Sequence, residues 1–264
     1  MPIFLENDSP RVFYPIGDYS IAKYLDLTKF ISLLQRKSLF FCRLDKLEDK
    51  FEGLSSNITH KLWVDEYKYH RDHTGVIEKS KTDREIETMV KNQFAFESIQ
   101  KPNTCVNCWN KFDFESPALW KIYSDFGKGV MIKSSISKLN MAFETNLDTI
   151  WISEVKYLNR KEEPYPSGNS IYPVIHKGLE YQYETEIRLI YELYFNGKPL
   201  NNHLYDWASE EIEAGLFSSV DLNLLIDEII IGPFTPNWYK KMIEDLTLKY
   251  GLKAVVRNSD LISS

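Results

Sequence analysis

The 264-residue sequence has few cysteines and no long hydrophobic run. Only Cys42, Cys105 and Cys108 are present, an odd number that argues against a disulfide framework and for a reducing compartment. No apolar stretch approaches the roughly 20 residues of a membrane-spanning helix. The opening MPIFLENDSP lacks the basic and apolar regions of a secretory signal. These absences predict a soluble, cytoplasmic protein with no membrane partner.

Complete metal and nucleotide motifs are also missing. Cys105-x-x-Cys108 is half of a zinc site, and neither the third cysteine nor the pair His70 and His73 completes it at a usual spacing. The sequence therefore predicts no metal. The segment DFGKG is too short for either glycine-rich nucleotide fingerprint, which disfavours kinase, P-loop and Rossmann proteins.

The charge balance is slightly acidic, with 32 Lys and Arg against 38 Asp and Glu and a net charge of −6. Bulk electrostatics therefore oppose binding to nucleic acid or to anionic membranes without a local basic patch. Hydrophobic residues make up 43% of the chain and aromatic residues 14%, which is enough for a packed core and for an aromatic pocket wall.

Helical and strand patterns are mixed along the chain. Residues 21–44 predict a strand, a helix and a strand, and residues 225–259 predict the same order again. Residues 61–100 are highly charged with apolar positions at helical spacing, which predicts a helical insertion covering one side of a sheet. We therefore expect one α+β domain, 1–264, with a mixed, mainly antiparallel sheet and this helical insertion.

One short helix is well defined by its ends. Ser116 followed by proline is typical of a helix start, and Gly127 of a helix end. Ser116 then has an ordinary explanation as the cap, and Trp120 and Tyr123 as core aromatics. Glu115 stands just before the helix, where the dipole favours a carboxylate, so it is a candidate for either a structural or a functional role.

The segment KGLEYQYETEIRLIY contains the strongest candidates for catalytic or ligand-binding residues. Lys177, Tyr181 and Glu184 fall on one face of a predicted helix. In the strand predicted after it, Glu184, Glu186 and Arg188 project from one face. This row is either a solvated strand edge or the wall of a cleft, in which the carboxylates support an oxocarbenium-like transition state and Arg188 holds them or binds a phosphate.

The order of the longer motifs resembles a bacterial family. It resembles the order in the family called domain of unknown function 2971. The motifs that carry this resemblance are, in chain order, KYLDL, ISLLQRKSLFFCRLDKLEDKFEG, CWN, ESPALWKIYSDFGKGVMIK, KGLEYQYETEIRLIY and EIIIGP. The resemblance spans roughly residues 20–262. It implies a protein of phage-defence, abortive-infection and toxin neighbourhoods, with a cognate antitoxin or another defence partner.

A second resemblance suggests a mechanism. The predicted elements follow an order similar to that of ADP-ribosyltransferases: a strand, the helix LTKFISLLQRK, the strand SLFFCRL and a late strand with E-x-E. The Ser-Thr-Ser strand and the His-Tyr-Glu set found in those enzymes are absent. It implies an ADP-ribosyltransferase-like fold, NAD as substrate, and a protein or nucleic-acid target. It assigns Glu186 as the catalytic glutamate, Glu184 as the residue that positions the acceptor, and Arg43 as the residue that holds NAD. The residues expected to bind substrate or ligand are Tyr24, Glu115, Ser116, Trp120, Tyr123, Lys177, Tyr181 and Arg188.

Two further functions remain open. The first is a non-catalytic sensing or partner-binding module of a defence system, in which the Glu/Arg row binds a ligand or braces the fold. The second is a metal-dependent nuclease, for which the turn DKLEDKFEG could supply Asp45, Asp49 and Glu52, although a solvated turn is the simpler interpretation.

Overall fold

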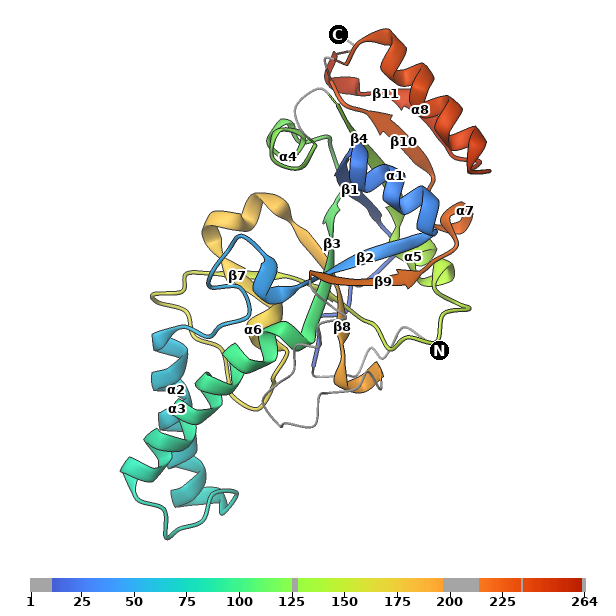
Figure 1. Cartoon of the computed structure of the whole chain (residues 1–264). Helices are drawn as coiled ribbons and strands as arrows, with labels where there is room; N and C mark the ends of the chain where they lie inside the picture. The colour runs from blue at the N-terminus through green and yellow to red at the C-terminus, as the bar shows by residue number, and fades with distance from the viewer. Residues whose placement is uncertain (1–10, 125–127, 197–213, 234, 263–264) are drawn as a thin grey trace.

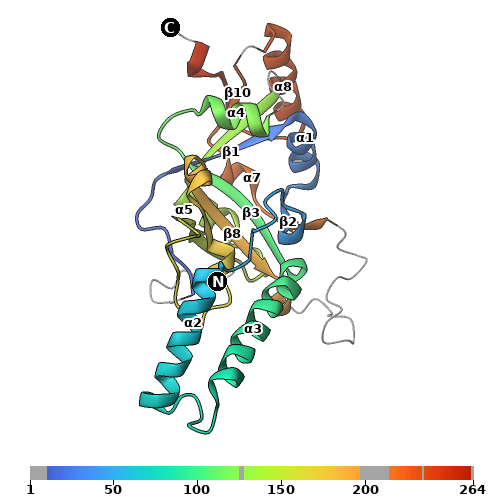
Figure 2. The ribbon, with the colours of Figure 1, turned by 90° about the vertical axis from the view of Figure 1, so that its left-hand side faces the viewer.

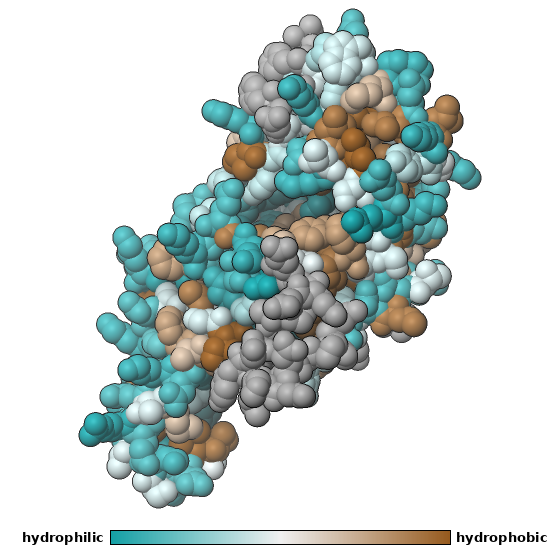
Figure 3. All heavy atoms as spheres, viewed as in Figure 1, coloured by the Kyte–Doolittle hydropathy of each residue, from teal (hydrophilic) through white to brown (hydrophobic). Residues whose placement is uncertain are grey.

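The structure is a computed structural model that describes residues 11–124, 128–196, 214–233 and 235–262. Within these residues it is an α+β protein with a mixed, mainly antiparallel sheet, as the sequence predicts. No helix in the described part of the chain is long and apolar enough to cross a membrane. The face shown in Figure 3 is largely hydrophilic, with hydrophobic residues gathered in its upper part and a hollow near its middle.

The main sheet has the strand order β11-β10-β4-β1-β3-β2-β9, with β8 paired to β3 and β5 paired to β8. Its strands are β1 Ser20–Asp26, β2 Ser38–Arg43, β3 Thr104–Lys111, β4 Gly129–Ser135, β5 Trp151–Glu154, β8 Glu186–Glu192, β9 Gly215–Ser219, β10 Glu228–Ile231 and β11 Val255–Asn258. A separate parallel pair consists of β6 Lys156–Leu158 and β7 His176–Gly178. Within the main sheet, only β10 and β11 pair in parallel among the described strands.

Helices lie around this sheet, except α2 Asn57–Tyr69 and α3 Asp83–Gln100, which extend away from it (Figure 1). The other described helices are α1 Leu27–Arg36, α4 Pro117–Tyr123, α5 Ile136–Ala142, α6 Tyr172–Ile175, α7 Leu222–Leu225 and α8 Asn237–Lys249. Short 3-10 helices are η1 Leu44–Lys46, η3 Lys101–Asn103, η4 Leu179–Glu184, η5 Tyr194–Asn196 and η6 Asp260–Ile262, and η2 His70–Thr74 is a π-helical turn.

The sheet branches at β3. Asn110 of β3 pairs with Ala22 of β1 on one side and with Glu186 of β8 on the other. Cys42 of β2 opposes Val106 on the side that β1 also occupies. Strands β1 and β2 therefore share one edge of β3, at its two ends, while β8 runs along the whole opposite edge. This branch point brings the late strand β8 next to the early part of the chain.

Alternation along the strands separates two faces. On β8, Ile187 and Leu189 point into the main core, which also contains Phe30 and Leu34 of α1. Arg188 and Ile190 alternate with them and point to the other face, where Ile190 packs in a second cluster. That second face also carries the charged residues described below.

Helices α2 and α3 form the charged insertion. Figures 1 and 2 show the two helices as a hairpin that extends away from the sheet, so the expectation that they cover one side of it is not met. Trp63 and Val90 pack between the helices together with Leu158 and Tyr165 from the body. This small cluster lies at the base of the hairpin and attaches it to the rest of the protein.

One sequence prediction of secondary structure is wrong, and one strand has no counterpart in the sequence analysis. The segment from Lys177 to Glu184 is not one helix but strand β7 followed by the 3-10 turn η4, because β7 pairs with β6. Strand β3 was not recognised, since its polar residues obscure the pattern of a buried strand. The start of α4 at Pro117 with Ser116 as its cap is confirmed. Its end is earlier than predicted, since the helix ends at Tyr123 with Ser124 as its C-cap, whereas Gly127 itself lies outside the described residues.

Candidate functional site: a buried ion-pair network

Five charged side chains meet beneath the surface next to β8. They come from the turn after η1, from β7, from the end of η4 and from β8 itself. We call them the charge network: Glu52, Lys177, Glu184, Glu186 and Arg188. Each is at most 7% exposed, and Arg188 is completely buried. Charged side chains are rarely buried to this extent unless they pair with one another.

The backbone between η4 and β8 explains how two glutamates reach the same place. Thr185 adopts a left-handed conformation with φ 43°, which is uncommon for a residue with a β-carbon. The turn leaves Thr185 exposed and directs Glu184 and Glu186 inward on either side of it. Arg188 follows on the same face of β8, as the period of two predicts.

Arg188 is the centre of the network. Its Nε and Nη2 donate to the two carboxylate oxygens of Glu186 at 2.7 and 2.8 Å, a planar pair of hydrogen bonds. Its Nη1 donates to Glu52 at 2.6 Å and also to the Val174 carbonyl. Burial opposes the charge of Arg188, but Glu186 and Glu52 raise its pKa well above the ordinary value.

Lys177 joins all three carboxylates. Its Nζ lies 2.7 Å from Glu184, 3.3 Å from Glu186 and 3.6 Å from Glu52. Burial lowers the pKa of Lys177, but Glu186 and Glu52 outweigh it and the net direction is upward. For Glu186, burial acts in the opposite sense, and Arg188 and Lys177 lower its pKa to about 2. These groups are therefore charged at neutral pH.

Three further residues line the network. Tyr123 of α4 donates from its hydroxyl to Glu184 at 2.8 Å, and its side chain is 39% exposed. The backbone N–H of Glu186 donates to the Tyr157 hydroxyl at 2.8 Å. Burial, followed by the charge of Glu186, raises the pKa of the Cys108 thiol, so this cysteine is not an activated nucleophile. Glu184 is thus the carboxylate that connects with the surface, through Tyr123.

Tyr181 partly covers Lys177. The Lys177 ammonium lies 4.7 Å from the centroid of the Tyr181 ring, within the range of a cation–π contact. The structure therefore brings together six of the residues predicted from sequence. These are Tyr123, Lys177, Tyr181, Glu184, Glu186 and Arg188.

Arg43 does not join them. It lies opposite Cys105, whose side chain belongs to the main core, and so faces the other side of the sheet from Glu186 and Arg188. Its guanidinium pairs with Asp45 through hydrogen bonds of 2.9 and 2.8 Å. The assignment of Arg43 to a site shared with Glu186 therefore lacks the required geometry.

Four other predicted residues form a separate group around α4. Tyr24 packs edge-on against Trp120, with ring centroids 5.0 Å apart, and its hydroxyl accepts the Ser116 N–H at 3.0 Å. Ser116 accepts the Leu119 N–H as the helix cap. Burial raises the pKa of Tyr24 to about 12. These contacts are structural, in agreement with the simpler interpretation of Ser116 and Trp120.

Glu115 ties α4 to the C-terminal segment. Its carboxylate accepts hydrogen bonds from Trp120 Nε1 at 3.0 Å, Ser259 Oγ at 2.5 Å and the Asp260 N–H at 2.9 Å. Arg257 lies 3.7 Å away. With these partners the carboxylate is fully used within the fold, so its position at the helix N-terminus has a structural role.

Sequence reasoning missed Glu52 and Tyr157 as members of the site. Glu52 was placed in a solvated turn, yet it is 2% exposed and bonds to Arg188. The neighbouring Asp45 pairs with Arg43, so the turn does not gather its carboxylates around a metal. Within the described residues no group of three or more His, Cys, Asp or Glu is arranged to hold a metal ion. The available signal for Glu52 was the glycine after it, which folds the turn back with φ 72°.

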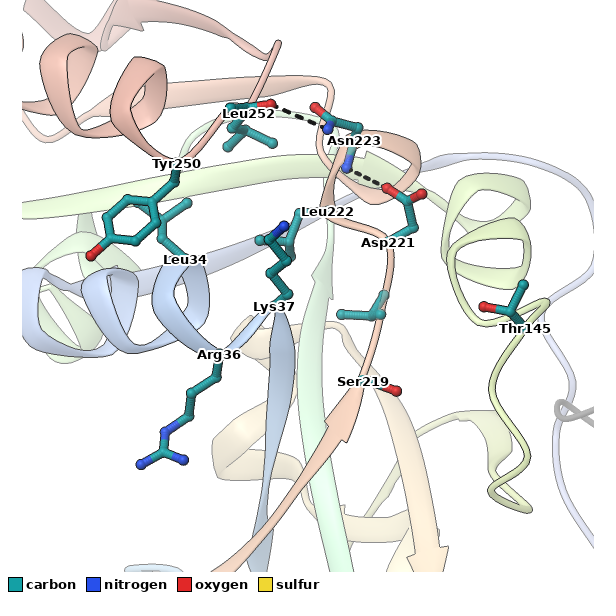
Figure 4. A pocket seen from close by; sticks show the side chains of 12 residues that line it. Leu34, Arg36, Lys37, Thr145, Ser219, Asp221, Leu222, Asn223, Tyr250 and Leu252 are labelled. Carbon is teal, nitrogen blue, oxygen red and sulfur yellow. Dashed lines mark hydrogen bonds between the residues drawn. The ribbon is translucent and has the colours of Figure 1, made fainter.

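A cavity of about 550 Å³ lies elsewhere (Figure 4). It is formed by the ends of α1 and α8 and the segment between β9 and α7, and it includes Lys37, Asp221, Asn223 and Tyr250. Arg36 extends away from the other labelled side chains. None of the predicted site residues lines this cavity, so size alone does not connect it with the charge network.

Comparison with protein-family models, with curated proteins and with solved structures found no match for this chain.

Proposed function

We propose that the charge network is the working site of an ADP-ribosyltransferase-like effector that takes NAD as substrate and modifies a protein or nucleic-acid target. The observation that carries this proposal is the 2.8 Å hydrogen bond between Glu184 and the half-exposed Tyr123. It gives one carboxylate of a preorganised network a connection to the surface. The motif order resembling domain of unknown function 2971 supports a setting in bacterial phage defence.

The chemistry needs a carboxylate beside the sugar. When the bond between nicotinamide and ribose breaks, the ribose gains oxocarbenium character, and a nearby carboxylate stabilises that positive charge. The acceptor then attacks the ribose carbon and releases a proton, so the products are nicotinamide and the ADP-ribosylated target. In this proposal Glu184 faces the substrate, because one of its oxygens accepts from the part-exposed Tyr123. Glu186 positions Lys177 and Arg188, because both of its oxygens accept from the fully buried Arg188.

The test is nicotinamide release from NAD by purified protein with cell extract as the source of acceptor. We expect Glu184→Gln to lower the rate at least about 100-fold, as for loss of a charge that acts in the transition state. Glu180→Gln is the matched control, since Glu180 lies on the same turn and is exposed. Melting temperatures of all variants separate lost activity from lost folding. Absence of release by the wild type with extract present would refute the proposal in this form.

A non-catalytic sensing or partner-binding module is the second candidate. It is favoured by the closure of the network, in which every carboxylate is already paired with Lys177 or Arg188 and is almost unexposed. In that case Glu186→Gln is less stable than the wild type, and neither protein turns over NAD. Binding of a defence partner to wild type but not to Tyr123→Ala, measured by calorimetry, would support this candidate.

A further inference from the structure

Free cationic groups lie at the cavity of Figure 4 and not in the charge network. Arg188 donates from Nε, Nη1 and Nη2 to groups of the protein, and Lys177 is shared among three carboxylates. The expectation that Arg188 binds a phosphate therefore does not fit this geometry. At the cavity, Arg36 and Lys37 line the wall, and within the described part of the chain neither side chain forms an ion pair or a hydrogen bond.

The backbone positions Lys37 at the cavity. Lys37 ends α1 in a left-handed conformation with φ 48°, and its N–H donates to the Leu33 carbonyl at 2.9 Å. Its carbonyl accepts the Val220 N–H at 3.0 Å, which ties the end of α1 to the segment after β9. Figure 4 shows the Lys37 side chain extending into the space between Tyr250 and Asp221. Backbone contacts, and no counter-charge, thus hold this ammonium in place.

The carboxylate in the cavity wall is used by the fold. Of the described residues that line the cavity, only Asp221 carries a carboxylate, and its Oδ1 accepts the N–H groups of Asn223 and Leu224 at 2.8 and 3.2 Å. The Asn223 side chain donates to the Gly251 carbonyl at 3.3 Å and accepts the Lys253 N–H at 2.9 Å. Two cations and one carboxylate leave the lining with one formal positive charge, in a chain whose net charge is −6. The cavity therefore favours an anion.

An exposed pair of rings adjoins the cavity. Phe40 of β2 and Phe217 of β9, which we call the aromatic pair, lie directly opposite each other with ring centroids 5.0 Å apart. They are 39% and 41% exposed. The Arg36 guanidinium lies 4.3 Å from the centroid of the Phe217 ring, and Ser219, on the same face of β9, lines the cavity. Arg36 and Ser219 therefore connect the aromatic pair with the cavity.

We infer that this surface binds a nucleotide, with its phosphate on Lys37 in the cavity and its base on the aromatic pair. An ammonium binds phosphate as a point charge, and bases stack on exposed phenylalanine rings and on arginine planes. The hydroxyls of Thr145 and Ser219, which have no partner among the described residues, are further donors for the phosphate. The volume of about 550 Å³ is typical of a small-molecule site. The nucleotide is either free or part of a single-stranded nucleic acid.

The inference is independent of the proposed function. None of the residues that carry it belongs to the charge network, and binding needs no turnover of NAD. Because the net charge of the chain opposes nucleic acids in general, binding depends on this local surface and should weaken with added salt.

The test is titration calorimetry at low salt with adenosine monophosphate, adenosine and inorganic phosphate, together with fluorescence anisotropy of a labelled oligodeoxyadenylate of about ten nucleotides. We expect the monophosphate to bind about tenfold more tightly than adenosine or phosphate, because it alone carries both the base and the phosphate. Tighter binding of the oligonucleotide than of the monophosphate would identify a nucleic-acid strand as the source, and weaker binding a free nucleotide. Failure of both to bind, or equal binding of adenosine and its monophosphate, would overturn the inference.

Variants locate the binding surface. Lys37→Asn removes the ammonium and introduces a residue that adopts the left-handed conformation readily, so we expect about tenfold weaker binding of the monophosphate with the fold retained. Phe217→Thr removes an exposed ring and keeps a residue suited to a strand, and should weaken binding several-fold. Lys91→Asn on α3 is the control, since Lys91 is exposed and distant in the sequence from both groups. Melting temperatures show whether each variant is folded.

Wild-type affinity in both Lys37→Asn and Phe217→Thr would place the nucleotide elsewhere and contradict the assignment. A loss in Lys91→Asn equal to that in Lys37→Asn would reduce the effect to net charge and contradict it as well. Weaker binding in Lys37→Asn and Phe217→Thr, with Lys91→Asn unchanged, would support it.

Discussion

Arg188 donates to both carboxylate oxygens of Glu186, at 2.7 and 2.8 Å. Arg188 is completely buried, and Glu186 is 3% exposed. This pair sets the character of the site, because it leaves neither residue free to act on a ligand directly. A paired, buried charge is tolerated only while its partners remain, so stability and function of the network are linked.

Loss of Lys177 should destabilise the protein strongly. Lys177→Met leaves three buried carboxylates facing one guanidinium, and removal of one partner from a buried pair costs about 3–5 kcal/mol. The free energy of unfolding from urea titration measures the effect. Lys61→Met on α2 is the control, since Lys61 is exposed and its replacement should change stability by less than about 0.5 kcal/mol. A similar change in the free energy of unfolding for both variants would show that the Lys177 ammonium does not stabilise the charge network.

Removing a carboxylate should compensate in part for the lost lysine. The double variant Lys177→Met with Glu184→Gln has one buried negative charge fewer than Lys177→Met alone. We expect it to be more stable than Lys177→Met by about 1–3 kcal/mol, a coupling typical of contacting groups. A double-mutant cycle measured by urea unfolding gives the value. Simple additivity of the two substitutions would contradict the 2.7 Å contact between these side chains.

Acid should remove the contribution of Glu186. Its pKa is about 2 in the folded protein against an ordinary value of 4.5, so the unfolded chain binds the proton first as pH falls. The stabilisation is complete above pH 4.5 and is lost as pH falls from there through about 2. We therefore expect the stability difference between wild type and Glu186→Gln to be largest near pH 6 and to shrink by pH 3. A difference that stays constant with pH would exclude Glu186 as its source.

Replacement of Arg43 should leave the site intact. Arg43 faces the opposite side of the sheet and pairs with Asp45, so Arg43→Lys should retain NAD turnover within about twofold if the chain has that activity. Nicotinamide release by equal amounts of folded protein is the measurement. A loss as large as that expected for Glu184→Gln would place Arg43 in the working site after all.

Local patterns were sufficient for many elements of the fold. The strand, helix and strand of residues 20–43 follow from apolar periodicity, and α4 from a serine cap followed by proline. The period of two placed Glu186 and Arg188 on one face of a strand correctly. Glu184 lies outside that strand, at the end of η4, and reaches the same place through the left-handed turn at Thr185. The helix predicted over Lys177 failed because pairing of β7 with β6 outweighs a short helical pattern.

By itself, the sequence determined the α+β class and the common face of the Glu/Arg row, since both depend on residues that are neighbours along the chain. Only the tertiary structure decided that the row is buried, that Glu52 completes it from more than 120 residues away in sequence, and that Arg43 lies on the other side of the sheet. All three depend on long-range contacts, such as the Glu52–Arg188 ion pair and the strand pairing around β3, that no local pattern encodes.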